Sequence, residues 1–207
     1  TNVARSASST AGVQSSALAR LARAKKVRDV AVALVQRGLI ATGGIVSEQQ
    51  FKAAVDAFFV YYAANLVATS KPFPGVVACL DALRRDGYKL AVCTNKTEAF
   101  TFPLLDQLQL TPFFDAIVGG DTFPVKKPDP GHITGTLGRI GGEISWAAMV
   151  GDSSNDINAA KAAKLPNVAV SFGYTRIPAA ELGADRLIHH FDDLRAALAP
   201  IAGKTTP

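Results

Sequence analysis

Short apolar segments alternate with helix-length segments from residue 71 to the end of the chain. The apolar segments have the length of buried strands and are bounded by Gly, Asp or Asn, and the segments between them have helical spacing. Strands are expected at 88–93, 114–118, 147–151, 167–171 and 186–188. Alternation at this spacing favours an α/β fold with a parallel sheet and helices on both faces.

Residues 1–70 have a different pattern, which is helical throughout. Residues 1–14 are rich in Ser, Ala and Thr and are expected to be loosely ordered. A first helix is predicted from Ser15 or Ser16 to Gly38, where glycine would end it. The Ser47…Gln50 pair is typical of a capping box and predicts a second helix to about Ala68.

The segment 71–75, Lys-Pro-Phe-Pro-Gly, separates these two patterns. We therefore predict two domains, a helical one at 1–70 and an α/β core at 71–207. No apolar run approaches the length of a membrane span, because Asp56 and Asn65 interrupt the longest candidate. Cys79 and Cys93 lie in apolar surroundings without metal-type spacing, which favours reduced thiols and a cytoplasmic protein.

The net charge of +5 is concentrated near the start of the chain. Residues 1–40 hold seven basic residues and one acidic residue, so the remainder sums to −1. No aromatic residue interleaves with the basic ones. We interpret them as a solvated helix face rather than as a nucleic-acid site, and we expect neither a nucleic-acid nor a membrane partner.

Two carboxylates follow the predicted strand 147–151. Asp152 comes directly after Gly151, and Asp156 comes four residues later, where a helix is expected to begin. Ligands of open α/β sheets bind beyond the carboxyl ends of the strands, and paired carboxylates there suit a hard cation. The alternative is structural: Asp152 as a turn residue and Asp156 in a first helical turn, where acidic residues are favoured.

Two further loops are expected at the same edge of the sheet. Thr94 and Asn95 follow the strand 88–93 and could hold phosphate oxygens, or could cap the next helix. Lys126 and Lys127 lie between prolines and could hold a phosphoryl group or neutralise carboxylates, or could form an exposed basic turn. Hydroxyl, cation and paired carboxylates together predict a site for phosphate and Mg²⁺.

The order of these motifs strongly resembles the haloacid dehalogenase superfamily. The motifs are Thr-Asn-Lys from Thr94, Lys-Pro-Asp-Pro from Lys127, and Val-Gly-Asp-Ser-x-x-Asp from Val150. The phosphoglycolate phosphatase-like branch is the most similar, and the helical residues 15–70 resemble the mobile cap of that branch. The resemblance implies a Rossmann-like core, a small phosphorylated substrate, an Mg²⁺ cofactor and a potential to dimerise.

The same resemblance implies a role for each matching residue. Thr94, with Asn95 beside it, matches the phosphate-binding Ser/Thr, and Lys127 matches the lysine that neutralises phosphate and nucleophile. Asp152 matches an Mg²⁺ ligand, and Asp156 matches the second acid, which supports the metal or the lysine. The implied catalytic residues are thus Lys127, Thr94 and Asp156, and the implied metal residues are Asp152 and Asp156.

One family motif has no counterpart in the sequence. The family begins with Asp-x-Asp-Gly-Thr at the end of a central strand, and its first aspartate attacks phosphorus; residues 1–60 contain nothing similar. The only methionine is Met149. We therefore expect that the chain lacks the first central strand and the nucleophile, and that the sheet has a gap between the strands that end at Thr94 and Gly151.

The expected function of the intact parent is hydrolysis of a small phosphomonoester, 2-phosphoglycolate, through an aspartyl-phosphate with Mg²⁺. This chain is expected to be inactive. Two alternatives stay open: a catalytically silent binding module, and another activity of the superfamily, either a sugar-phosphate mutase or a dehalogenase. The histidines His132, His189 and His190 have no assigned role and are expected at surface or packing positions.

Overall fold

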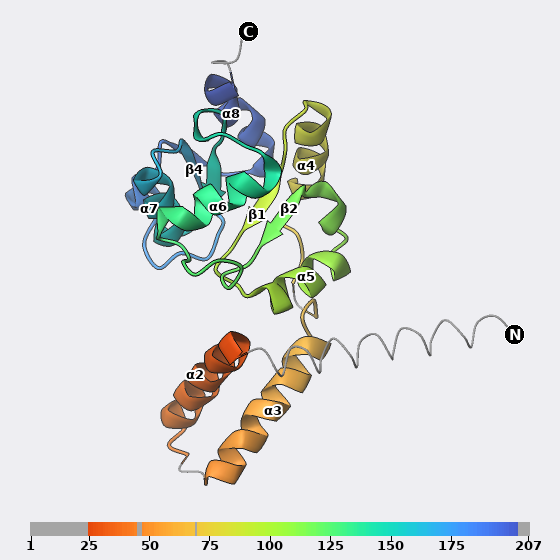
Figure 1. Ribbon diagram of the computed structural model, residues 1–207, viewed down its shortest axis with the longest axis vertical. Coiled ribbons are helices and arrows are strands. Elements are labelled where there is room, and N and C mark those ends of the chain that lie inside the picture. The colour runs from red at the N-terminus through yellow and green to blue at the C-terminus, as the bar shows by residue number, and fades with distance from the viewer. Residues whose placement is uncertain (1–24, 45–46, 69, 203–207) are drawn as a thin grey trace, which may run out of the picture. The chain divides into compact units, whose positions relative to one another are not determined.

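The computed structural model describes residues 25–44, 47–68 and 70–202 (Figure 1). The loosely ordered start expected at 1–14 and the predicted beginning of the first helix lie outside these residues. The helices are α2 (Lys25–Ala41), α3 (Glu48–Ala64), α4 (Val76–Arg85), α5 (Glu98–Gln107), α6 (Pro130–Ile140), α7 (Ser154–Ala162) and α8 (Leu194–Ala202). The strands are β1 (Ala91–Cys93), β2 (Ala116–Val118), β3 (Met149–Gly151), β4 (Asn167–Val170) and β5 (Arg186–Ile188). Short 3-10 turns occur at Thr111–Phe113, Ile144–Trp146, Ala179–Leu182 and Phe191–Asp193.

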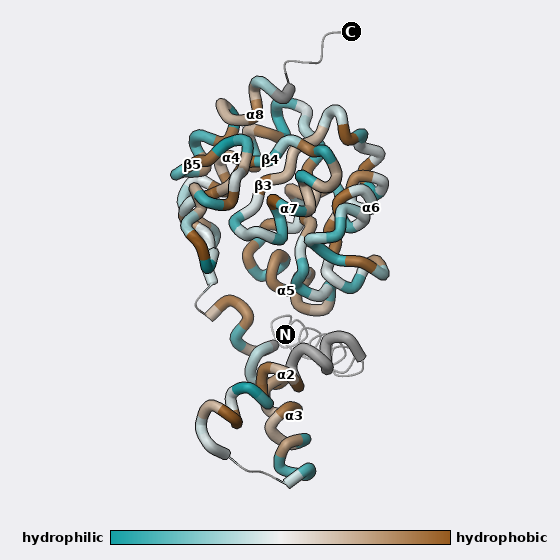
Figure 2. Tube along the Cα trace, turned by 90° about the vertical axis from the view of Figure 1, so that its left-hand side faces the viewer, coloured by the Kyte–Doolittle hydropathy of each residue, from teal (hydrophilic) through white to brown (hydrophobic). Residues whose placement is uncertain are grey.

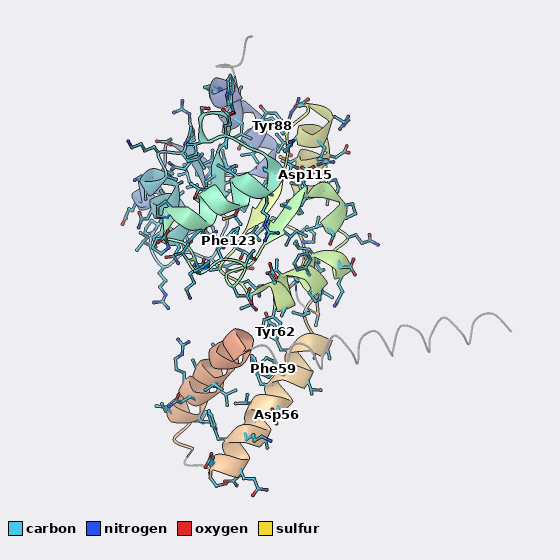
Figure 3. The ribbon with its side chains drawn as sticks, in the orientation of Figure 1. Asp56, Phe59, Tyr62, Tyr88, Asp115 and Phe123 are labelled. Atoms are coloured by element: carbon cyan, nitrogen blue, oxygen red, sulfur yellow. The ribbon has the colours of Figure 1, made fainter. Side chains whose placement is uncertain are left out.

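Contacts within the chain divide it into two compact units between Ser70 and Lys71. The first unit contains α2 and α3, which pack on each other. α3 carries both hydrophilic and hydrophobic residues (Figure 2), and it buries Val55 and Phe59, which are 1% and 5% exposed. Phe59 projects from α3 together with Asp56 and Tyr62 (Figure 3). No helix of the described residues is long and apolar enough to cross a membrane.

The capping box of α3 is confirmed, but the ends of both helices differ from prediction. The Ser47 hydroxyl accepts from the Gln50 N–H at 3.3 Å, and the Gln50 side chain accepts from the Ser47 N–H at 2.9 Å. α2 continues through Gly38, because an exposed glycine costs a helix only about 1 kcal/mol. α3 ends at Ala64 because the side chain of Asn65 bonds back to the Tyr61 carbonyl at 2.8 Å and caps it.

The second unit has the expected α/β fold with parallel strands. β1 pairs with β2, with Val92 opposite Ile117. β3, β4 and β5 form a second group in that order, with Val150 opposite Val168 and Ala169 opposite Leu187. Among the described residues no strand pairs β1 with β3, so the sheet is interrupted at the expected place.

Helices cover both faces of the strands. On one face, α6 packs on β1 and β2 and α7 packs on β3 and β4 (Figure 1). On the other face, Leu83 of α4 and Leu194 of α8 pack with Val168 and Ile188. Fully burying one such side chain contributes roughly 1.5–3 kcal/mol. Three layers result, with β4 buried at every position.

The strands beside the interruption are less buried than β4. Every residue of β1 and of β3 is only partly buried, although both strands are as apolar as β4. An edge without a partner strand explains the difference, because the side chains and backbone on that side have no neighbouring strand to cover them. The interruption therefore leaves an open space between the carboxyl ends of β1 and β3.

Candidate active site

The loops that follow β1, β2 and β3 meet at one cavity of about 340 Å³. The loop after β1 brings Thr94, Asn95 and Lys96 to it. The loop after β2 brings Lys127, and the loop after β3 brings Asp152 and Asp156. Parallel strands place all their carboxyl ends at one edge, and this is why three distant segments of sequence converge here.

Lys127 is the most constrained of these residues. Its neighbour Lys126 is exposed, whereas Lys127 is only 5% exposed. Its ammonium group donates to Oδ1 of Asp156 at 2.5 Å and to the backbone carbonyl of Cys93. The alternative of an exposed basic turn is therefore wrong for Lys127, because a buried ammonium group requires partners of this kind.

Both carboxylate oxygens of Asp156 are occupied. Oδ1 accepts from Lys127, and Oδ2 accepts from the Ser153 hydroxyl at 2.7 Å and from the backbone N–H groups of Ser153 and Asp152 at 3.0 and 3.2 Å. Burial raises the pKa of Asp156, but the charge of Lys127 and the hydrogen bonds from Lys127 and Ser153 outweigh it and hold that pKa below the ordinary value of 3.8. Asp156 thus closes a capping box on α7 and holds the lysine in place.

Asp152 is held by the segment that follows β4. Its Oδ2 accepts from the Tyr174 N–H at 2.7 Å. Gly173 lies so close that a methyl group there would meet the Cβ of Asp152 at 2.1 Å. Within the described part of the chain, Oδ1 of Asp152 accepts no hydrogen bond, so this oxygen is available to a ligand.

A metal ion would fit here with few protein ligands. The described residues contain no group of three or more His, Cys, Asp or Glu side chains that could hold a metal. Mg²⁺ does not need such a group, since it is usually bound by one or two carboxylates, waters and substrate phosphate. Oδ1 of Asp152, beside an open polar cavity, is suited to that arrangement.

Thr94 and Asn95 do not cap α5, so that alternative is wrong: the helix begins after Thr97. The Thr94 hydroxyl accepts from the Lys96 N–H at 3.1 Å and keeps its own proton to donate. Asn95 donates to the backbone carbonyl of Lys127 at 2.8 Å and so joins the first loop to the second. Its buried Oδ1 has no hydrogen-bond partner among the described residues.

Three residues that shape this site were not predicted from the sequence. Ser153 precedes Asp156 by three positions, a capping-box spacing that was visible in the sequence. Cys93 lines the cavity, and its sulfur lies 3.4 Å from Nδ1 of the buried His132. His132 is at a packing position, as expected, but it is fully buried and forms polar contacts that no local signal predicts.

A family model of haloacid dehalogenase-like hydrolases matches residues 35–170. The chain belongs to this family, whose parallel α/β fold agrees with the structure. It is similar to proteins named phosphoglycolate phosphatase. The protein of that name from Caulobacter vibrioides is 45% identical over 165 residues, covering 80% of this chain and 70% of the relative. The Agrobacterium fabrum protein is 48% identical over 143 residues, covering 69% and 61%.

A solved structure supports the same relationship. The crystal structure of a predicted phosphoglycolate phosphatase from Haemophilus somnus 129PT superposes with a TM-score of 0.73 at 31% identity. The match covers 84% of this chain and 76% of that chain. The chain therefore spans about 60–70% of the two relatives named above and three quarters of this structure.

Proposed function

We propose that this chain is part of an Mg²⁺-dependent phosphomonoester hydrolase that acts on 2-phosphoglycolate. The observation that carries the proposal is the convergence of Thr94, Lys127 and Asp152 on one cavity. The substrate is suggested by the names of the relatives, which are phosphoglycolate phosphatases. The helical unit, with α2 and α3, would act as the cap that excludes water and selects the substrate.

The phosphate would be held by the loops after β1 and β2. An ammonium group has three N–H donors, and the described residues accept two of those of Lys127. The third is left for a phosphate oxygen. The Thr94 hydroxyl supplies a second donor from the neighbouring strand, so a phosphoryl group between them would receive two hydrogen bonds, one of them from a cation.

Mg²⁺ would be held by Asp152, and when bound it would neutralise charge on the phosphoryl oxygens. We assign Asp156 the supporting role, because its oxygens already accept from Lys127 and Ser153. Coordination through Oδ1 of Asp156 would place Mg²⁺ next to the ammonium group of Lys127, and Oδ2 already accepts three hydrogen bonds. Both carboxylates were expected at the metal. We propose that Asp152 is the ligand and that Asp156 supports the site without binding the metal.

No carboxylate at the cavity is assigned here as the nucleophile. Asp152 and Asp156 are the only carboxylates among the described residues that line the cavity, and both are engaged by hydrogen bonds. The sequence contains no Asp-x-Asp-Gly-Thr motif. We therefore propose that the aspartyl-phosphate of the intact parent forms on a residue that these 207 positions do not supply, and that the chain alone has little turnover.

Binding and turnover can be measured separately on the purified chain. Calorimetry with inorganic phosphate and Mg²⁺ should detect binding, and Thr94→Val should weaken it about tenfold, the effect of losing one hydrogen bond to a charged group. Thr134→Val, on the exposed side of α6, is the matched control. Phosphate release from 2-phosphoglycolate should stay at the blank. Absence of phosphate binding would contradict the site, and turnover would contradict the missing nucleophile.

A second candidate is a catalytically silent module that binds phosphoesters. It is favoured by the small number of carboxylates at the cavity: among the described residues only Asp152 and Asp156 line it, and the proposal above already assigns them to the metal and to Lys127. The protein isolated from its native cells decides between the two. Hydrolysis of 2-phosphoglycolate by that material supports the hydrolase, and phosphate binding without hydrolysis supports the module.

A further inference from the structure

The imidazole of His132 is neutral and has a defined tautomer. The side chain is 0% exposed, and Nε2 lies 3.0 Å from the carbonyl oxygen of Gly119. A carbonyl oxygen only accepts, so Nε2 carries the proton. Burial lowers the pKa of His132 more than the bond to Gly119 raises it, and the charge of Lys127 lowers it further. Nδ1 is therefore an unprotonated acceptor.

Cys93 supplies the donor for that nitrogen. Its sulfur lies 3.4 Å from Nδ1 of His132, whereas the carbonyl oxygen of His132 is farther away at 4.0 Å, and the Thr136 side chain also contacts the sulfur. Burial raises the pKa of the Cys93 thiol, so the group keeps its proton. The S–H of Cys93 thus donates to His132 and ties the end of β1 to α6.

The backbone of Cys93 is not held by the neighbouring strand. The carbonyl of Leu90 accepts from the N–H of Asp115, just before β2, and the N–H of Thr94 donates to Val118 of β2. Backbone groups of successive residues in a strand point to alternate edges, so those of Cys93 face the open edge. There the carbonyl oxygen of Cys93 accepts from the ammonium group of Lys127. The position of this oxygen therefore depends on the side chain of Cys93.

The surroundings of His132 leave the ring little freedom. The ring of Phe123 meets it edge-on with 6.0 Å between centroids, and Phe123 lies beside α6 (Figure 3). Gly135 is packed against that ring, since a methyl group there would meet Phe123 at 2.7 Å. Thr136 bonds to the His132 carbonyl at 2.7 Å. The histidine is thus a fixed point within the fold.

We propose that His132 and Cys93 are positioning residues, which hold the ammonium group of Lys127 in its place between Asp156 and the cavity. The order of contacts is Gly119, His132, Cys93, Lys127 and Asp156, each joined to the next by one hydrogen bond. The expected effect on phosphate binding rests on the function proposed above. The expected effect on the position of the Lys127 ammonium group does not.

The test replaces each of the two cysteines in turn. Cys93→Ala removes the donor, and Cys93→Ser restores an O–H donor at the same position on a shorter bond. Cys79→Ala is the matched control, because Cys79 is a buried thiol of α4 in a different core cluster from the one that Cys93 contacts. Two readouts are taken on the whole chain: the ¹H–¹⁵N resonance of the Lys127 ammonium group, and the affinity for inorganic phosphate.

Cys93→Ala should shift or broaden the Lys127 resonance, and Cys93→Ser and Cys79→Ala should leave it in place. Phosphate affinity should fall about threefold to tenfold in Cys93→Ala alone, the range expected for one hydrogen bond. An unchanged Lys127 resonance in Cys93→Ala, or equal changes in Cys79→Ala, would overturn the proposal. If the wild-type chain binds no phosphate, the proposed function fails, whereas the resonance still decides the role of Cys93 and His132. If Cys93→Ala does not fold, His132→Gln takes its place: a shifted Lys127 resonance in that variant supports the proposal, and an unshifted one overturns it.

Discussion

The ammonium group of Lys127 and the carboxylate of Asp156 form an ion pair at 2.5 Å, with side chains only 6% and 9% exposed. The two residues lie 29 positions apart and come from loops after different strands. Such a pair contributes little net stability compared with apolar packing, but breaking it leaves a buried charge without a partner. The pair therefore makes the geometry of the cavity sensitive to either residue.

Asp156→Asn should lower the free energy of unfolding by about 3–5 kcal/mol, because Lys127 would keep its charge without a counter-ion. Urea denaturation followed by circular dichroism measures the change. The control is Asp106→Asn on the exposed side of α5, for which a change within about 0.5 kcal/mol is expected. Equal effects of the two substitutions would show that the ion pair is not the cause.

Stability should also depend on pH through Asp156. The pKa of this residue is lowered in the folded chain, so the folded state binds its proton less readily than the unfolded state does. Its contribution is complete above the ordinary pKa of 3.8 and is lost as the pH falls below that value. The free energy of unfolding, measured by urea denaturation between pH 6 and pH 3, should fall less steeply in Asp156→Asn than in the wild type, by at most ~1.4 kcal/mol per pH unit. Parallel curves would contradict the assignment.

Gly120→Ala should destabilise the chain by about 1–3 kcal/mol, the usual cost of forcing a group into a packed site. An added methyl group would meet the backbone oxygen of Asn95 at 2.3 Å, and backbone cannot move aside as a side chain can. Gly138→Ala in α6 is the control, since nothing lies within 4 Å of its added methyl group. It should stabilise by up to about 1 kcal/mol. Thermal unfolding of the two variants should therefore move in opposite directions.

Gly173→Ala should weaken Mg²⁺ binding and leave phosphate binding without metal nearly unchanged. The added methyl group would lie 2.5 Å from Oδ2 of Asp152 and would therefore displace this carboxylate. Thr94 and Lys127 belong to other loops and should keep their positions. Calorimetric titration with Mg²⁺ and with inorganic phosphate, each alone, gives the two affinities. A loss of phosphate affinity as large as the loss of Mg²⁺ affinity would show that the substitution disturbs the whole cavity.

The sequence by itself determined which segments are helices and strands and which loops meet at the cavity. Periodicity is a local property, so the strands at 114–118 and 186–188 and the capping box at Ser47 could be found without a structure. The rule that parallel strands share a carboxyl-end edge then brought Thr94, Lys127 and Asp152 to one side. The end of α2 was misjudged because an exposed glycine only weakly opposes a helix.

Only the tertiary structure decided what each of these side chains contacts. The sequence Lys126-Lys127 gives no reason for one lysine to be exposed and the other buried; the difference comes from Asp156 and the Cys93 carbonyl, which lie 29 and 34 positions away. The neutral tautomer of His132 likewise depends on Gly119 and Cys93, brought together by β2, β1 and α6. Hydrogen bonds between distant segments leave no periodic trace in the sequence, because each is set by how the elements pack and not by residue spacing.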